Sequence, residues 1–267
     1  MSAFKEKVCV ITGASSGIGR ELAMLLADEG ARLVLAARNE ERLETIARAC
    51  RKLGGEAHIV PTDVADQQAC KNLIEETIET YGQLDMLVNN AGISMWARFD
   101  EVEDLGYLEK IMRINFFGSM YCTHYALPHL KKSQGRIVGI SSLTGKTGVP
   151  TRTAYAASKH AMAGFFDSLR IELMDQGVSV TMIYPGFVST EVRQRAMGPD
   201  GKPIGDSPVK ENQVMTAEEC ARIIQRAAAD RKREVVMTLK AKAGLWLKLI
   251  APGMVDRIAQ KTIAEGK

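Results

Sequence analysis

Short apolar segments alternate with longer amphipathic segments along most of this chain, and this alternation restricts the fold more than any other feature. Apolar runs at residues 8–12, 32–37 and 57–61 are separated by amphipathic runs at 18–29 and 39–53. Their lengths and periodicities predict strand, helix, strand, helix and strand in succession. The strands are apolar at consecutive positions, which is typical of parallel strands covered by helices on both faces.

The same alternation continues to residue 237. It predicts helices at 67–81, 102–132, 153–175 and 217–229, and strands at 84–89, 136–141, 178–184 and 234–237. Thr216 and Glu219 have the spacing of a capping box at the start of the last of these helices. We therefore expect a single-domain α/β fold, a doubly wound parallel sheet of seven strands with helices on both faces.

Composition and charge narrow the class of protein. The 267 residues carry 35 basic and 32 acidic side chains, a net charge of +3, so no basic excess favours a nucleic-acid partner. The five cysteines contain no CxxC pair, and the four histidines lack zinc-ligand spacing, which indicates a reducing compartment and no metal. No signal peptide and no apolar stretch of about 18 residues is evident. We expect a water-soluble, cytoplasmic protein.

A glycine-rich turn joins the first strand to the first helix. Its GxxxGxG spacing lets the backbone approach a pyrophosphate, whose charge the free N–H groups at the helix start would meet. A purely structural turn is the alternative, since such a turn alone is a weak signal. The residues predicted to bind a dinucleotide here are Gly13, Ser15, Ser16, Gly17, Ile18 and Gly19.

The end of the second strand favours NADP(H) over NAD(H). Enzymes that use NAD place an acid about 20 residues beyond the glycines, but Ala37 and Arg38 stand there. Arg38 offers a planar cation that suits a 2′-phosphate, or it caps the following helix in solvent. Asp63 with Val64, after the third strand, would seat the adenine, or Asp63 would cap the helix that begins near Asp66.

Tyr155 and Lys159 lie four residues apart on a predicted helix, which places both side chains on one face. Such a pair is common and by itself is more often structural. Two polar residues upstream, Asn115 and Ser142, change that assessment: Ser142 follows Asn115 by 27 residues and precedes Tyr155 by 13.

With these motifs the chain resembles the short-chain dehydrogenase/reductase family from residue 7 to about 237. The matching motifs are the glycine turn, Asn89-Asn90-Ala91-Gly92, Asn115, Ser142, Tyr155-xxx-Lys159, and Pro185-Gly186 with Thr190. The resemblance implies a Rossmann-type dinucleotide-binding domain at 1–239. That domain would hold the catalytic site and a substrate lid at about 190–215, and residues 240–267 would form a C-terminal amphipathic extension.

The resemblance also implies a catalytic set. Tyr155 would be the general acid and base, and Lys159 would lower its pKa and hold the nicotinamide ribose. Ser142 would donate a hydrogen bond to the substrate oxygen, and the carbonyl of Asn115 would hold a water that relays protons.

Members of the family are typically homodimers or homotetramers, so the resemblance implies a homo-oligomer.

The resemblance also implies further residues that bind the cofactor. Asn89 would brace the sheet, and Asn90, Ala91 and Gly92 would lie beside the adenine ribose. The nicotinamide would be lined by Pro185, Gly186, Phe187 and Val188, with Thr190 bonded to its carboxamide.

Substrate contacts are expected from the loops after strands four to six. Ser142 and Tyr155 would meet the reacting oxygen, and Ser94, Met95, Trp96 and Phe187 suggest an apolar pocket. The alternative is that the apolar members simply cover the core.

The segment 240–253 combines lysines with apolar residues and Trp246, as an interfacial helix would. In this it is similar to the hydroxysteroid-dehydrogenase-like branch of the family. Burial against a partner subunit or over the substrate pocket is favoured over peripheral membrane contact.

These expectations predict an NADP(H)-dependent enzyme that interconverts an alcohol and a ketone or aldehyde on an apolar small molecule. The alternative is a non-catalytic nucleotide-binding sensor or scaffold of the same fold.

Overall fold

The computed structural model describes residues 2–206 and 214–264, and within them seven parallel strands form one sheet. The strand order is β3-β2-β1-β4-β5-β6-β9, so the direction of winding reverses between β1 and β4. In sheets of this kind ligands bind outside the carboxyl ends of the strands at that reversal. The strands are β1 (Val8–Thr12), β2 (Arg32–Ala37), β3 (Glu56–Pro61), β4 (Met86–Asn89), β5 (Arg136–Ile140), β6 (Ser179–Tyr184) and β9 (Glu234–Val236).

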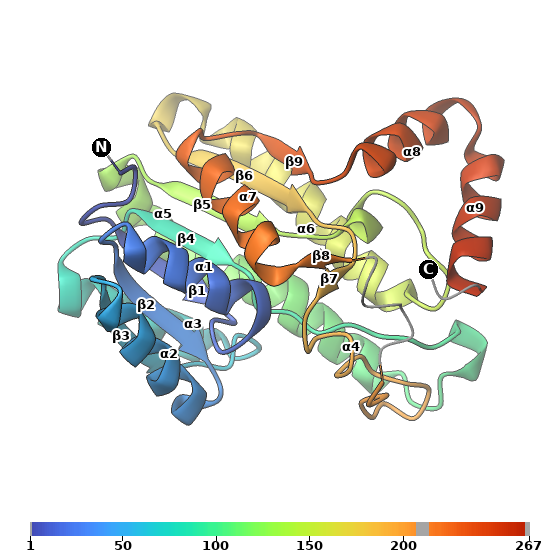
Figure 1. The fold of residues 1–267 in the computed structure, drawn as a ribbon, viewed down its shortest axis with the longest axis horizontal. Helices are drawn as coiled ribbons and strands as arrows, with labels where there is room; N and C mark the ends of the chain where they lie inside the picture. The colour runs from blue at the N-terminus through green and yellow to red at the C-terminus, as the bar shows by residue number, and fades with distance from the viewer. Residues whose placement is uncertain (1, 207–213, 265–267) are drawn as a thin grey trace.

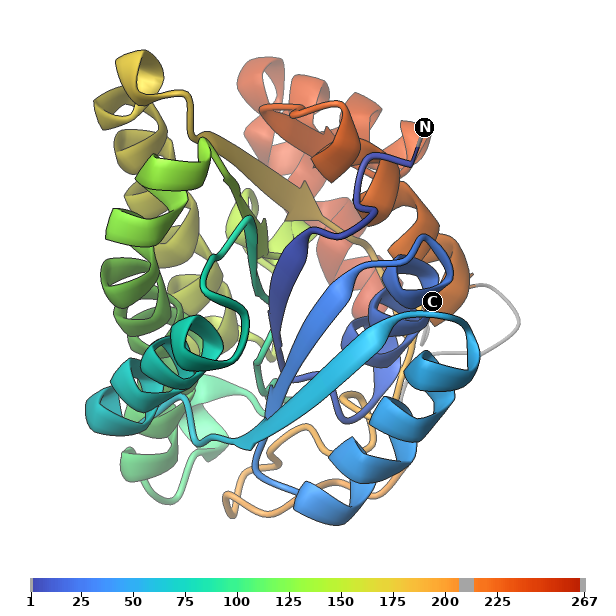
Figure 2. The ribbon, with the colours of Figure 1, turned by 90° about the vertical axis from the view of Figure 1, so that its left-hand side faces the viewer.

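Helices cover both faces of the sheet, as predicted (Figures 1 and 2). One face carries α1 (Gly17–Asp28), α2 (Glu40–Lys52) and α7 (Ala217–Ala229), and the other carries α3 (Gln67–Tyr81), α5 (Gly118–Ser133) and α6 (Thr153–Glu172). Successive strand residues enter opposite cores: Cys9 and Ile11 pack under α1, whereas Val10 packs under α3 and α5. The run of apolar residues in β1 is thereby explained.

The predicted helix at 102–132 is divided. A 3₁₀ turn η1 (Phe99–Glu101) precedes α4 (Gly106–Met112), and the π-helical turn η2 (Arg113–Phe117) joins α4 to α5. Asn115 lies in this π turn, and its carbonyl accepts a hydrogen bond from the Ser119 hydroxyl at 3.0 Å. A π turn inserts one residue into the helical ladder and is frequent at functional sites.

A second, small sheet joins the two ends of the predicted lid. In it β7 (Val188–Ser189) pairs in parallel with β8 (Met215–Thr216), and Thr216 then caps α7 in the predicted capping box with Glu219. Met197 forms isolated bridges to Met95 and Pro203. Part of the predicted lid, residues 207–213, lies outside the described residues.

Two helices follow β9 and extend away from the sheet at the right of Figure 1: α8 (Leu239–Ile250) and α9 (Pro252–Ala264). None of the residues of α8, all of which the structure describes, is buried; Trp246 is 71% exposed and Ile250 is 84% exposed. No helix in the described part of the chain is long and apolar enough to cross a bilayer.

Candidate active site

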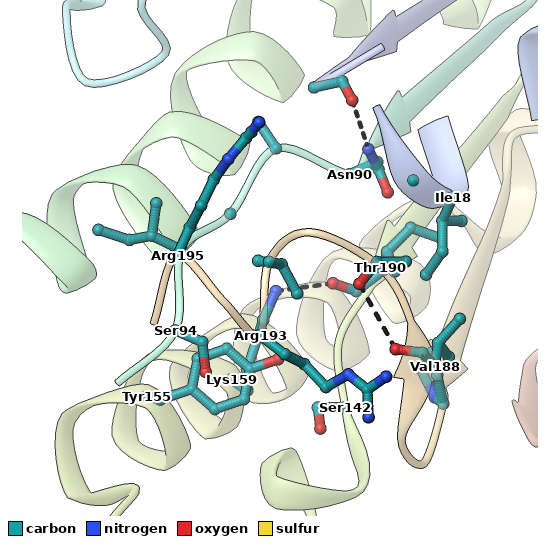
Figure 3. A pocket seen from close by; sticks show the side chains of 18 of the residues that line it. Ile18, Asn90, Ser94, Ser142, Tyr155, Lys159, Val188, Thr190, Arg193 and Arg195 are labelled. Atoms are coloured by element: carbon teal, nitrogen blue, oxygen red, sulfur yellow. Dashed lines mark hydrogen bonds between the residues drawn. The ribbon is translucent and has the colours of Figure 1, made fainter. Parts of the chain in front are cut away.

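A cavity of about 730 Å³ lies at the carboxyl ends of the strands. Its wall is built from the turn after β1, the loops after β2 to β6, the start of α6 and one side of α9. In Figure 3 the labelled Ile18 and Asn90 lie at one end of this space, and Ser142 and Tyr155 lie toward the other. The cavity thus connects the glycine turn to the predicted catalytic set.

The glycine turn packs so closely against neighbouring backbone that a Cβ would not fit at two of its positions. Gly13 has φ of +65°, and a Cβ there would lie 2.8 Å from the Cα of Ala91. A Cβ on Gly19 would lie 2.5 Å from the carbonyl oxygen of Gly13, so Gly19 packs the start of α1 against β1 instead of lining the cavity. Ser15, Ser16, Gly17 and Ile18 do line it. The turn therefore leaves room for a ligand at the amino end of α1.

Thr12 ties this turn to the loop after β4. Its hydroxyl donates to the carbonyl of Val88 at 3.2 Å and accepts from the backbone N–H groups of Asn90 and Ala91 at 3.0 and 3.1 Å. The Asn90 amide in turn donates to the carbonyls of Thr12 and Gly13 at 2.9 and 3.2 Å. The two loops that approach the ligand from either side are thus one hydrogen-bonded unit.

Cationic side chains line the end of the cavity beside β2. Arg38, Arg42 and Arg195 all line it, and Arg42 and Arg195 both form ion pairs with Glu191. Arg38 forms no hydrogen bond or ion pair with any other residue that the structure describes. Asn39, not Arg38, caps α2 by accepting from the N–H of Arg42 at 2.8 Å. The helix-capping alternative for Arg38 is therefore not what the structure shows.

Asp63 and Val64 also line the cavity. The Asp63 carboxylate accepts from the N–H of Ala65 at 3.0 Å, while Asp66 caps α3. Asp63 thus stiffens its own turn beside the cavity, and the capping role falls to Asp66.

Tyr155 and Ser142 face each other across the floor of the cavity (Figure 3). Burial raises the pKa of the Tyr155 phenol, while the nearby Arg152 guanidinium and a hydrogen bond with Ser142 act to lower it. That Lys159 also lowers this pKa stays a prediction. The Ser142 hydroxyl also accepts from the N–H of Thr144 at 3.2 Å, whereas Ser141 donates to the carbonyl of Lys159 and is buried.

Lys159 is 4% exposed, and its Nζ donates to the carbonyl of Ile140 at 2.8 Å. The same nitrogen lies 5.8 Å from the centroid of the Tyr155 ring. Burial lowers the pKa of Lys159 to about 8. The lysine is thus held at the cavity floor by the end of β5, one turn along α6 from Tyr155.

Asn115 does not line the cavity; it is fully buried behind the loop after β4. Its side chain accepts from the N–H of Ile93 at 2.8 Å and donates to the Ile93 carbonyl at 3.0 Å and to the Ser158 hydroxyl at 2.9 Å. Asn115 therefore fixes the loop after β4 against α6, the helix that carries Tyr155 and Lys159.

The loop after β6 completes the wall. Pro185, Gly186, Phe187, Val188 and Thr190 line the cavity, as do Ala91 and Gly92 from the loop after β4. The Thr190 hydroxyl faces the carbonyl of Val188 at 3.5 Å (Figure 3), which orients it within the loop.

The predicted substrate residues divide into two groups. Ser94 and Phe187 line the cavity, but Met95 and Trp96 do not. Met95 is fully buried in a small core with Ala97, Tyr107 and Ile111, so its placement agrees with the core alternative. Trp96 stacks on the guanidinium of Arg152, whose carbon lies 4.3 Å from the indole centroid.

Sequence reasoning missed several residues of this wall. Arg152, three residues before Tyr155, lines the cavity next to it, and that spacing was the available signal. Three residues of α9 also line the cavity, namely Ala259, Thr262 and Ile263, which supports the expectation that the tail covers the pocket.

Comparisons with known proteins agree with this geometry. The model of the short chain dehydrogenase family matches residues 7–199. The 11-beta-hydroxysteroid dehydrogenase-like 4A protein of Arabidopsis thaliana is 39% identical over 253 residues, which cover 93% of this chain and 82% of that one. The dehydrogenase/reductase SDR family member 7B of Mus musculus is 36% identical over 261 residues, covering 95% and 80%.

A solved structure with the same fold is that of an alcohol dehydrogenase from Thermococcus sibiricus complexed with 5-hydroxy-NADP. It superposes with a TM-score of 0.75 at 26% identity and covers 86% of this chain and 95% of that one.

Proposed function

We propose that this chain, which belongs to the short-chain dehydrogenase/reductase family and to its hydroxysteroid-dehydrogenase-like branch, interconverts an alcohol and a ketone or aldehyde with NADP(H). In the reductive direction, a carbonyl compound, NADPH and a proton give the alcohol and NADP⁺. The observation that carries this proposal is the convergence of Ser142, Tyr155 and Lys159 on a cavity that also holds the glycine turn.

The residues of the cavity fit a nicotinamide dinucleotide. Gly13 lets the turn pack against the backbone of Ala91, where a Cβ would not fit, and the start of α1 presents backbone N–H groups that suit a pyrophosphate. Three arginines at the far end suit a 2′-phosphate, and no described acidic side chain lines the cavity at the end of β2. These features favour NADP(H) over NAD(H).

When bound, the reduced cofactor supplies the hydride. Tyr155 holds the proton at its phenol oxygen and donates it to the carbonyl oxygen on which negative charge develops. Ser142 donates a hydrogen bond to the same oxygen. Lys159, a cation at neutral pH, favours the phenolate that forms, as does Arg152.

Asn115 acts by position. It holds the loop after β4 and α6 in register, so the phenol and the ammonium keep their places relative to the cofactor site.

The test is a kinetic comparison of wild type with Tyr155→Phe, following NADPH absorbance with a panel of ketones, aldehydes and hydroxysteroids. We expect kcat to fall by about 1000-fold, because the general acid is lost, while the Kd for NADPH changes little. Wild-type binding of NADPH without turnover on any member would favour the sensor or scaffold alternative. Retained turnover in Tyr155→Phe would place the acid elsewhere.

A further inference from the structure

Arg152 is a buried cation at the catalytic end of the cavity. It is 6% exposed, and its guanidinium donates to the hydroxyl of Ser94 at 2.7 Å. The guanidinium carbon lies 4.3 Å from the ring centroid of Trp96 and 5.7 Å from that of Tyr155. Its Nε has no hydrogen-bond partner among the residues that the structure describes. Stacking on Trp96 thus fixes a donor group next to the catalytic phenol.

No described carboxylate balances this charge. The hydroxyl of Ser94 is neutral, and among the described residues no Asp or Glu forms an ion pair with Arg152. A second arginine, Arg193, is 5% exposed, reaches the same cavity (Figure 3) and is close enough to lower the pKa of Arg152. A buried charge without an ionic partner is costly, so an anion beside Arg152 would be stabilising.

Arg152 remains charged at neutral pH. Burial lowers its pKa only to about 10. Arg152 therefore carries a positive charge when the enzyme is at work, with only 6% of the residue exposed. Such a site favours an anionic group strongly.

The cofactor's phosphates do not account for this charge. The places suited to them are the glycine turn at the start of α1 and the cluster of Arg38, Arg42 and Arg195. Arg152 instead contacts Ser94, Trp96 and Phe187, at the end of the cavity where Tyr155 lies.

We infer that the substrate carries an anionic group, a carboxylate or a phosphate, which Arg152 binds a few bonds from the carbonyl that Tyr155 protonates. This inference rests on the proposed oxidoreductase function. The same wall contains the apolar side chains of Leu143, Val149, Phe187 and Ile263 beside a few threonines, so the remainder of the substrate is mainly apolar. The substrate class is an oxo acid or an oxo phosphate ester with an apolar chain.

The kinetic test uses matched neutral and anionic compounds. We would compare kcat/KM for 2-oxo- and 3-oxooctanoate with that for their methyl esters, and for hydroxyacetone phosphate with that for hydroxyacetone. The carboxylate and phosphate arms distinguish the two sources of the anion. In wild type we expect an anionic compound to be favoured by at least about tenfold over its neutral partner.

Arg152→Gln should abolish the preference for the anion: the ratio of kcat/KM for the favoured anion to kcat/KM for its neutral partner should fall by at least about tenfold, toward one, as expected for the loss of one member of a buried charge pair. The ratio is used because Arg152 also acts on the pKa of Tyr155, an effect that both compounds share. Arg222→Gln is the matched control, because Arg222 is exposed and pairs with Glu218 on α7. If Arg152→Gln does not fold, Arg152→Lys replaces it and should retain part of the preference for the anionic compound. The comparison of anionic and neutral compounds in wild type does not depend on either variant.

A binding measurement separates this inference from the proposed function. The chain has two tryptophans, so in a Trp246→Phe background the fluorescence of Trp96 reports on Arg152. Titration of the NADP⁺-loaded protein with octanoate or inorganic phosphate should give a saturable change that Arg152→Gln abolishes.

Two outcomes decide the matter. Equal use of neutral and anionic compounds, with no fluorescence response, would overturn the anion site and leave the oxidoreductase function intact. Failure to oxidise NADPH with every compound would count against the proposed function, and the titration would still decide whether Arg152 binds anions.

Discussion

The Nζ of Lys159 donates to the backbone carbonyl of Ile140 at 2.8 Å, and not to the phenol of Tyr155. This bond fixes the lysine to the end of β5, and burial brings its pKa to about 8, down from 10.5. Below pH 8 the site therefore holds an ammonium ion, and above it a neutral amine.

This ionisation predicts how cofactor affinity depends on pH. NADPH is anionic, so its binding should favour the ammonium form of Lys159 and should weaken as the pH rises through about 8. The loss of affinity should be up to about tenfold, because a rise of one unit in the pKa of Lys159 on binding corresponds to a tenfold change in Kd. The measurement is a fluorescence titration of NADPH from pH 6.5 to 9.5. Lys159→Met should bind weakly at every pH and show no step, whereas Lys71→Met, on the exposed face of α3, should behave as wild type. A step that survives in Lys159→Met would assign the ionisation to another group.

Arg38 should determine the choice between the two nicotinamide cofactors. Replacing Arg38 by Ala removes an exposed guanidinium at the end of β2 that has no other partner in the described residues. The Kd for NADPH should rise by about 10- to 100-fold, as expected for lost bonds to a charged group, and the Kd for NADH should stay within about twofold. Isothermal titration with both cofactors measures this. Equal losses for NADPH and NADH would show that Arg38 does not bind the 2′-phosphate.

Gly19→Ala should disrupt the glycine turn. The new Cβ would lie 2.5 Å from the carbonyl oxygen of Gly13 and 2.6 Å from the amide nitrogen of Asn90, so the turn must shift. We expect unfolding to become easier by about 2 kcal/mol and cofactor binding to be lost. The control is Gly164→Ala in α6, where nothing lies within 4 Å and alanine should stabilise the helix by about 0.5–1 kcal/mol. Denaturant unfolding and NADPH titration of both variants test this, and unchanged binding in Gly19→Ala would refute it.

Asn115→Ala should leave the N–H and the carbonyl of Ile93 without partners and should remove a donor from the Ser158 hydroxyl, which keeps its own bond to the Tyr155 carbonyl. The free energy of unfolding should fall by about 3 kcal/mol, and kcat should fall as the loop after β4 loses its place. Urea unfolding measures the first effect and steady-state kinetics the second. Asn72→Ala, which removes one exposed bond to Gln68, should change stability by less than about 0.5 kcal/mol. If the two variants proved equally stable, the bracing role of Asn115 would be wrong.

The predictions from sequence succeeded where a local pattern of residues is enough to determine the structure. The strands of the sheet are short apolar runs between helices, and β1 pairs in parallel with β2 and β4 as that pattern predicts. Helix ends were predicted within a residue or two where a side chain caps them, as Asn39 and Thr216 do.

The failures arise from contacts between segments distant in the sequence. The π turn at Asn115 depends on the loop around Ile93, which an amphipathic pattern does not reveal. The burial of Met95 depends on Tyr107 and Ile111, and the stacking of Trp96 depends on Arg152. The burial that raises the pKa of Tyr155 depends on how loops distant in the sequence pack around the phenol.

The wall formed by α9 differs in kind from the rest of the cavity. Its residues belong to a helix that the sheet does not support, joined through α8, which buries none of its described side chains. The groups proposed to act on the carbonyl lie instead on α6 and in the loop after β5, two segments that pack directly on the sheet. Under the proposed function, selectivity for the chain end of a substrate and the chemistry at its carbonyl would be encoded in separate parts of the molecule, so that natural selection or an engineer could alter the first while leaving the second intact.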